Sequence, residues 1–112
     1  MEFYKELYIS ENLKKNKDRI IEKLKKNKIQ FRCYIISLTE NPKNQLEFYD
    51  SLMLMQKNYK KENLFIVGIA NGYDGALEII EKITEETYAK QGDADIRRFI
   101  MNHQNQIEES EE

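Results

Sequence analysis

The chain has 112 residues, of which 40 % are hydrophobic and 34 % are charged, and its net charge at pH 7 is −2. A chain of this length forms one domain that buries roughly 65 % of its unfolded surface, so it folds without help from disulfides or metals. Its single cysteine, Cys33, excludes disulfide frameworks and thiolate metal sites within one chain. We find no signal peptide and no apolar stretch near the ~20 residues of a membrane span, which predicts a cytoplasmic protein without a membrane partner.

The first part of the chain predicts a strand, a helix and a second strand. Residues 3–9 end in an apolar run, and Ser10 is a candidate N-cap for the helix that follows. Apart from a narrow apolar stripe, this helix is dominated by lysine. Residues 31–38 are apolar on both faces and predict a buried strand. Cys33 lies inside this run, so we expect it to be a small buried hydrophobic residue.

The segment from Pro42 to Lys60 predicts a second helix, with Asn41 as its N-cap and Pro42 in its first position. Its apolar residues form a band wider than one face of a small sheet requires. Methionine and aromatic side chains outside the core are common at partner surfaces. The band therefore predicts an interface with a partner protein or with a second copy of the chain. Its candidate residues are Phe48, Leu54 and Met55.

The run from Leu64 to Ala70 is apolar throughout, which is typical of a strand that helices cover on both faces. Asn71 and Gly72 end the strand, and apolar residues then recur at helical spacing as far as Tyr88. Gly92 predicts the end of this third helix in a left-handed conformation. A short fourth helix follows at residues 94–103, capped by Asp93. Residues 105–112 predict an acidic disordered tail, so a single α/β domain spans residues 1–104.

Strands and helices alternate in the order βαβαβα, with an additional C-terminal helix. Helical crossovers join parallel strands, so this order predicts a small, Rossmann-like three-layer sandwich with three mainly parallel strands. The apolar faces of the second and third strands favour the order 2-1-3, with helices on both faces. The order 1-2-3, with both crossover helices on one face, is the alternative.

A parallel sheet brings the ends of its strands to one edge, where ligands bind in open α/β folds. Helix capping explains most of the polar residues at these strand ends, but Glu40 and Tyr73 have no capping role. The glycines at positions 68, 72 and 75 match neither a phosphate-binding loop nor a dinucleotide fingerprint. The predicted rim, a candidate site for a small molecule or an anion, consists of Ser10, Thr39, Glu40, Asn71, Gly72, Tyr73 and Asp74.

Catalytic chemistry has little support in the sequence. The single histidine, His103, has no second histidine for a metal site and is expected to interact with the end of its helix. We identify no catalytic residue, no metal ligand set and no cofactor motif. The lysines between residues 14 and 28 predict a solvated helix face rather than a nucleic-acid site, because arginine is scarce and the whole chain is acidic.

Three segments, Leu64–Ala70, Gly72–Glu78 and Asp95–Phe99, resemble a family of small uncharacterised intracellular proteins from anaerobic Firmicutes. The resemblance covers nearly the whole chain and implies a compact bacterial protein of no established activity. Two classes of function remain. The first is a non-enzymatic protein-interaction module, with a protein partner or with itself. The alternative is a binder of a small molecule or an anion at the predicted rim.

Overall fold

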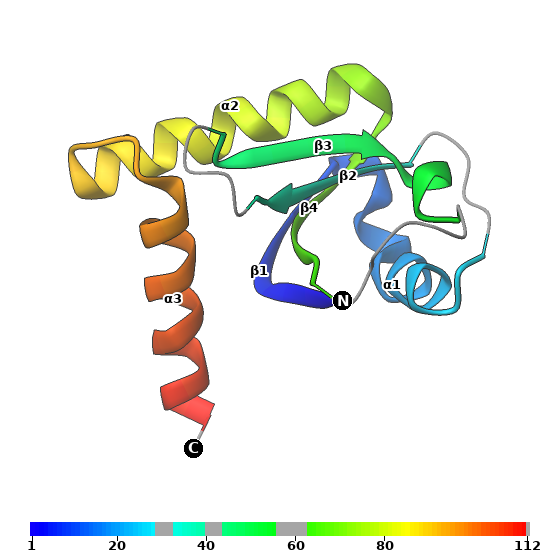
Figure 1. The fold of residues 1–112 in the computed structure, drawn as a ribbon, viewed down its shortest axis with the longest axis horizontal. Helices are drawn as coiled ribbons and strands as arrows, with labels where there is room; N and C mark the ends of the chain where they lie inside the picture. Colours follow the sequence, from blue (N-terminus) through cyan, green and yellow to red (C-terminus); the bar gives the residue numbers. More distant parts are fainter. Residues whose placement is uncertain (29–32, 40–43, 56–62, 112) are drawn as a thin grey trace.

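The computed structural model describes residues 1–28, 33–39, 44–55 and 63–111. Within them the strands form one sheet in the order β1-β4-β2-β3 (Figure 1). None of the described helices is long and apolar enough to cross a membrane. The elements in chain order are β1 (Glu2–Ile9), the 3-10 helix η1 (Glu11–Asn16), α1 (Lys17–Lys25), β2 (Cys33–Leu38), β3 (Leu46–Asp50), the 3-10 helix η2 (Ser51–Met55), β4 (Phe65–Asn71), α2 (Gly72–Gln91) and α3 (Ile96–Glu111).

The sheet is mixed, so the predicted set of three mainly parallel strands is wrong, and so are both predicted strand orders. Strands β1 and β4 run parallel, whereas β2 runs antiparallel to both of its neighbours, β4 and β3. The reason lies in the connection between β2 and β3. Residues 39–45 are too few for a helical crossover, so these two strands form an antiparallel hairpin.

The predicted helix from Pro42 to Lys60 is also wrong where the structure describes it, because Leu46–Asp50 form β3. Phe48 packs toward α2, while Tyr49 belongs to the core on the opposite face of the sheet. Apolar residues on both faces of a strand imitate the broad band of a buried helix. The Asp50 carboxylate accepts the N–H of Leu52 at 3.0 Å, in a turn that ends the strand. The predicted cap residues, 41 and 42, lie outside the described residues.

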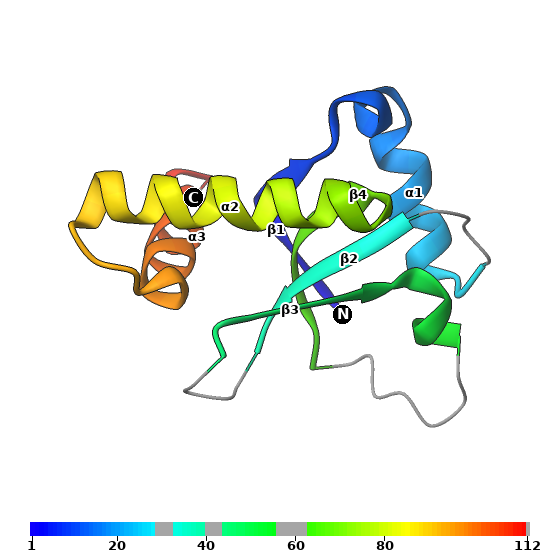
Figure 2. The ribbon, with the colours of Figure 1, turned by 90° about the horizontal axis from the view of Figure 1, so that it is seen from above.

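Helices cover both faces of the sheet, with α2 and α3 on one face and α1 on the other (Figures 1 and 2). Each face has its own buried core, and β2 and β4 contribute residues to both. On the α2 face the buried residues include Ile36, Val67, Ile79, Ile83 and Ile100, and on the α1 face they include Ile20, Leu24, Ile35, Ile66 and Ile69.

The pairing of β4 with each of its neighbours, β1 and β2, is irregular between Ile66 and Gly68. On β4, Val67 is the extra residue of a β-bulge, because Ile36 and Ser37 of β2 pair with residues 68 and 66. On β1, residues 4–7 lie between the two paired stretches and are not matched to β4. The Lys5 N–H donates instead to Oε1 of Gln104 in α3, at 2.9 Å. Helix α3 therefore satisfies a backbone group that the sheet leaves unpaired.

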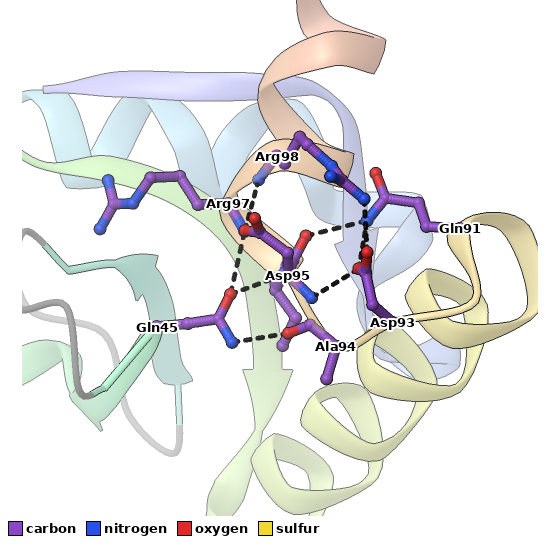
Figure 3. A network of polar contacts seen from close by, with 8 residues as sticks. Gln45, Gln91, Asp93, Ala94, Asp95, Arg97 and Arg98 are labelled. Carbon is purple, nitrogen blue, oxygen red and sulfur yellow. Dashed lines mark hydrogen bonds and ion pairs between the residues drawn. The ribbon is translucent and has the colours of Figure 1, made fainter.

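The start of α3 is capped by a side chain from a distant part of the sequence. Gln45, which directly precedes β3, accepts the N–H groups of Ile96 at 2.5 Å and Arg97 at 3.3 Å through Oε1 (Figure 3). The predicted cap, Asp93, instead accepts the N–H of Asp95 at 3.0 Å, and this hydrogen bond is the main reason why the pKa of Asp93 is lowered. The contacts of Gln45 tie α3 to the β2–β3 hairpin.

Helix α2 ends where the sequence predicts. Gly92 has a φ of 77° in the left-handed region, and its N–H donates to the Tyr88 carbonyl at 2.8 Å. Helix α3 then continues to Glu111 and includes residues 105–111, for which the sequence predicts a disordered tail. An ion pair between Lys5 and Glu111 joins the end of this helix to β1.

Candidate functional site

Most of the predicted rim lies together where β1 and β4 end. The parallel direction of these two strands brings Ser10 beside the start of α2, and its Oγ accepts the N–H of Asn71 at 2.9 Å. Ser10 makes no side-chain cap to η1, so its predicted capping role is wrong. The rim residues that the structure brings to this edge are Ser10, Asn71, Gly72, Tyr73 and Asp74.

Thr39 does not belong to this rim, which corrects the prediction. Because β2 is antiparallel to β4, its first residue, Cys33, pairs with Asn71. Its last residue, Leu38, pairs with Phe65 and so lies at the opposite ends of the strands from the rim. Thr39 is buried there, and its N–H donates to the Gln45 carbonyl at 3.1 Å. The remaining predicted rim residue, Glu40, lies outside the described residues.

The lining of the rim disfavours an anion. A cavity of about 480 Å³ opens beside Ser10 and Asn71, and its charged residues are Glu11, Asp74, Glu78 and Lys82. Three carboxylates against one ammonium group repel a negatively charged ligand. The turn from β4 into α2 requires a φ of 77° at residue 72, which glycine adopts without steric cost, so the turn needs no ligand to explain its glycine.

The predicted interface residues do not form one surface. Leu54 is 2 % exposed and belongs to the core on the α1 face, beside Ile20, Leu24 and Tyr49. The predicted intermolecular contact through Leu54 is therefore wrong, because residues 46–55 of the predicted helical band form β3 and η2 instead. Phe48 is half-buried on the α2 face of β3. The side chain of Met55 lies outside what the structure describes.

An aromatic patch, defined by Tyr34, Phe48, Tyr73 and Leu77, lies on the α2 face next to β3. The ring centroid of Tyr73 is 5.5 Å from that of Phe48 and 6.2 Å from that of Tyr34. Tyr73 is 55 % exposed, and Leu77, one helical turn further along α2, is 43 % exposed. The sequence singles out Phe48 and Tyr73 for separate reasons, and the structure brings them together.

A second cavity, the β1 groove, follows β1 between α2 and α3 and has a volume of about 400 Å³. It adjoins the rim cavity, with which it shares Ile9, Ile79 and Lys82. No local sequence pattern indicates this groove, because its lining combines residues 4–14 with residues 79–103. Its apolar residues include Leu7, Ile9, Ile79 and Phe99, and its charged or ionisable residues are Glu6, Lys14, Lys82, Glu86, Lys90 and His103 together with Tyr4 and Tyr8.

Two tyrosine hydroxyl groups in the β1 groove make hydrogen bonds to side chains of the helices, one to α3 and one to α2. The Tyr4 hydroxyl lies 2.6 Å from Nδ1 of His103, and the Tyr8 hydroxyl donates to the Glu86 carboxylate. Burial raises the pKa of Tyr4 to about 12. Burial also raises the pKa of Tyr8, and the hydrogen bond to Glu86 adds to this effect. The sequence predicts that His103 interacts with the end of its own helix, and this prediction is wrong, because α3 continues to Glu111 and His103 contacts Tyr4 of β1.

We expect the protein to lose stability as the pH rises from 10 to about 12, because the pKa of Tyr4 is higher in the folded chain than the ordinary value of 10.0. A raised pKa stabilises the protonated, folded form below pH 10, and this contribution disappears as Tyr4 ionises. Urea unfolding at several pH values measures the effect, and absorbance at 295 nm follows tyrosine ionisation. Tyr4→Phe should weaken the pH dependence, whereas Tyr88→Phe, at a residue that is 64 % exposed, should not. Identical pH dependence in both variants would contradict the prediction.

Cys33 is buried, as the sequence predicts. Burial, together with a smaller contribution from the charge of Asp50, raises the pKa of its thiol to about 11. The thiol is consequently protonated and inert at neutral pH. In the part of the chain that the structure describes, no group of three or more histidine, cysteine, aspartate or glutamate residues could hold a metal ion.

Comparison with known proteins finds no matching family model, no significantly similar curated protein and no significantly similar solved structure. The resemblance to a family from anaerobic Firmicutes therefore stays a prediction. The fold and its surfaces define a small α/β protein with a four-stranded mixed sheet. This sheet carries the aromatic patch near its β3 edge and the β1 groove near its other edge.

Proposed function

We propose that the chain is a non-enzymatic protein-interaction module of the cytoplasm, which binds another protein or a second copy of itself through the aromatic patch and the edge of β3. The observation that carries the proposal is the aromatic patch, in which the exposed ring of Tyr73 lies against Phe48 and the exposed Leu77 follows one turn further along α2. Leu52 and Met53 directly follow β3, while Tyr73 and Leu77 lie in the first turns of α2. Figure 1 shows η2 and the first turns of α2 on the same side of the molecule. A concentration of exposed apolar and aromatic side chains is typical of a surface that binds a partner.

The edge of β3 supports this proposal. β3 bonds to β2 on one side, and no described strand pairs with its other side. An unpaired edge offers N–H and C=O groups to an added strand. In an antiparallel pair of two copies centred on Phe48, Glu47 faces Tyr49 of the second copy, so like charges do not oppose each other. A partner strand with basic residues would complement Glu47 and Asp50 equally well.

The alternative function, a small-molecule or anion binder at the predicted rim, has weaker support. Thr39 lies at the opposite ends of the strands from the rim, and the lining of the rim cavity carries three carboxylates. Tyr73, which had no capping role in the sequence analysis, contacts Phe48 in the aromatic patch. Tyr73 therefore starts α2 at the rim but does not line the rim cavity, and its ring belongs to the aromatic patch.

Substitutions in the aromatic patch should weaken association without unfolding the chain. Tyr73→Ser and Leu77→Glu each alter an exposed side chain, so we expect folded proteins whose self-association is at least about tenfold weaker than that of wild type. Tyr88→Ser is the matched control, because it removes an even more exposed tyrosine at the other end of α2. Sedimentation velocity from ~5 to ~500 µM measures the association constants.

A photo-crosslinking residue at position 73 covers the case of a different protein partner. In cells that naturally make the protein, position 73 should crosslink to one dominant protein, and position 88 should not. Mass spectrometry then shows whether this protein is a second copy or another chain. A monomeric wild type at ~500 µM, combined with equal crosslinking at both positions, would contradict the proposed function.

A further inference from the structure

The β1 groove lies away from the surface of the proposed function. We infer that it binds a small organic anion, with a carboxylate or phosphate group beside Lys82 and Lys90 and an apolar body against Leu7, Ile79 and Phe99. The volume of about 400 Å³ lies within the range of small-molecule sites. The inference is independent of the aromatic patch and concerns another edge of the sheet.

The lysines and carboxylates that line the groove are Lys14, Lys82 and Lys90 against Glu6 and Glu86, an excess of one positive charge that favours a negative ligand. Lys82, Glu86 and Lys90 recur at intervals of four residues on one side of α2, so they share one face of the helix. The Tyr8 hydroxyl engages the Glu86 carboxylate, and neither lysine forms an ion pair with a carboxylate of the described residues. The Lys82 ammonium group lies 6.0 Å from the centre of the Tyr8 ring. Two ammonium groups beside a cavity in an acidic chain are therefore available to an anion.

The apolar lining gives the groove a preference for an organic anion over an inorganic one. Leu7 and Ile9 of β1, Ile79 of α2 and Phe99 of α3 contribute this surface. Covering such side chains removes apolar surface from water and so stabilises a complex. An inorganic phosphate ion would leave them in water, whereas an aliphatic or aromatic body would cover them.

His103 adds a polar group to the groove. The Tyr4 hydroxyl lies 2.6 Å from Nδ1 of His103, in a hydrogen bond whose donor depends on the tautomer of the ring. Oε1 of Glu6 is 3.9 Å from Nε2, which is too far for a hydrogen bond. Nε2 is therefore the ring atom that can contact a polar group of a ligand in the groove.

Three probes of similar shape test the inference by NMR titration of the full chain. They are 2-naphthoate, 2-naphthyl phosphate and the neutral 2-naphthalenemethanol. We expect saturable amide shifts around Tyr8, Lys82 and Phe99 with at least one of the two anions. The neutral probe should bind at least about tenfold more weakly, because it lacks the charge that Lys82 and Lys90 recognise. The ratio of the two anion affinities shows whether the groove prefers a carboxylate or a phosphate.

Paired variants separate the groove from the overall charge of the chain. Lys82→Gln/Lys90→Gln should weaken binding of the better anion about tenfold. Lys15→Gln/Lys28→Gln makes the same change of charge at exposed lysines outside the groove, so it should leave the affinity within about twofold. Equal weakening in both pairs, shifts centred on Tyr73 and Leu77, or no saturable binding of either anion would overturn the inference.

Discussion

Replacement of Leu54 by alanine should lower the free energy of unfolding by about 3 kcal/mol and leave the oligomeric state unchanged. Leu54 is 2 % exposed and holds η2 against the core of the α1 face, beside Ile20 and Leu24. Removing its methyl groups loses the transfer free energy of buried carbon and leaves a cavity. For a domain whose total stability is of order 5–15 kcal/mol, this is a large fraction.

Urea unfolding measures the loss, and the next residue provides the control. Met53 is 41 % exposed, so Met53→Ala should cost less than about 0.5 kcal/mol. The opposite result would contradict this prediction. If Leu54→Ala changes the sedimentation of the protein and its free energy of unfolding equals that of Met53→Ala, Leu54 lies at an intermolecular contact, as the sequence predicts.

Gly68→Val should be similarly destabilising, by about 3 kcal/mol, because α2 packs closely over this position of β4. A Cβ atom at residue 68 would lie 3.0 Å from Cδ1 of Ile36 and 3.1 Å from Cγ2 of Ile79. Both distances are shorter than an ordinary carbon contact of roughly 3.5–4.0 Å. The glycine therefore permits the close approach of helix and sheet at the β4 bulge.

A double-mutant cycle tests this cause directly. Ile36→Val deletes Cδ1, the atom nearest to the added side chain, and should cost about 1 kcal/mol by itself. If the crowding is real, the double variant Gly68→Val/Ile36→Val loses less stability than the sum of the two single variants. Strict additivity would show that another mechanism, such as a disturbed bulge, explains the effect of Gly68→Val.

The strongest sequence signal, the run from Leu64 to Ala70, indicates correctly that this strand is buried on both faces. The structure places β4 between β1 and β2, with helices above and below. The weak apolar run of residues 3–9 conflicts with a central position in the predicted order 2-1-3. Its place at the edge of the sheet resolves this conflict, because an edge strand needs less apolar cover.

Surface assignments were harder to predict than the core strands. Phe48 and Tyr73 are both singled out by the sequence, but their contact at 5.5 Å depends on β3 being a strand and lying beside α2. The β1 groove was not predicted at all. Its contact between Tyr4 and His103 joins residues that are 99 positions apart, and no local pattern reports such a pairing.

The sequence by itself determined the local elements whose apolar spacing or terminal residue has one structural interpretation. These are the strand β4, the helix α2 with its stop at Gly92, and the burial of Cys33. The direction of β2, the existence of β3 and the positions of both candidate surfaces were decided only by the tertiary structure. The physical reason is that hydrophobic periodicity records how many faces of an element are buried, whereas strand direction and neighbouring side chains depend on loop length and on pairings between distant residues.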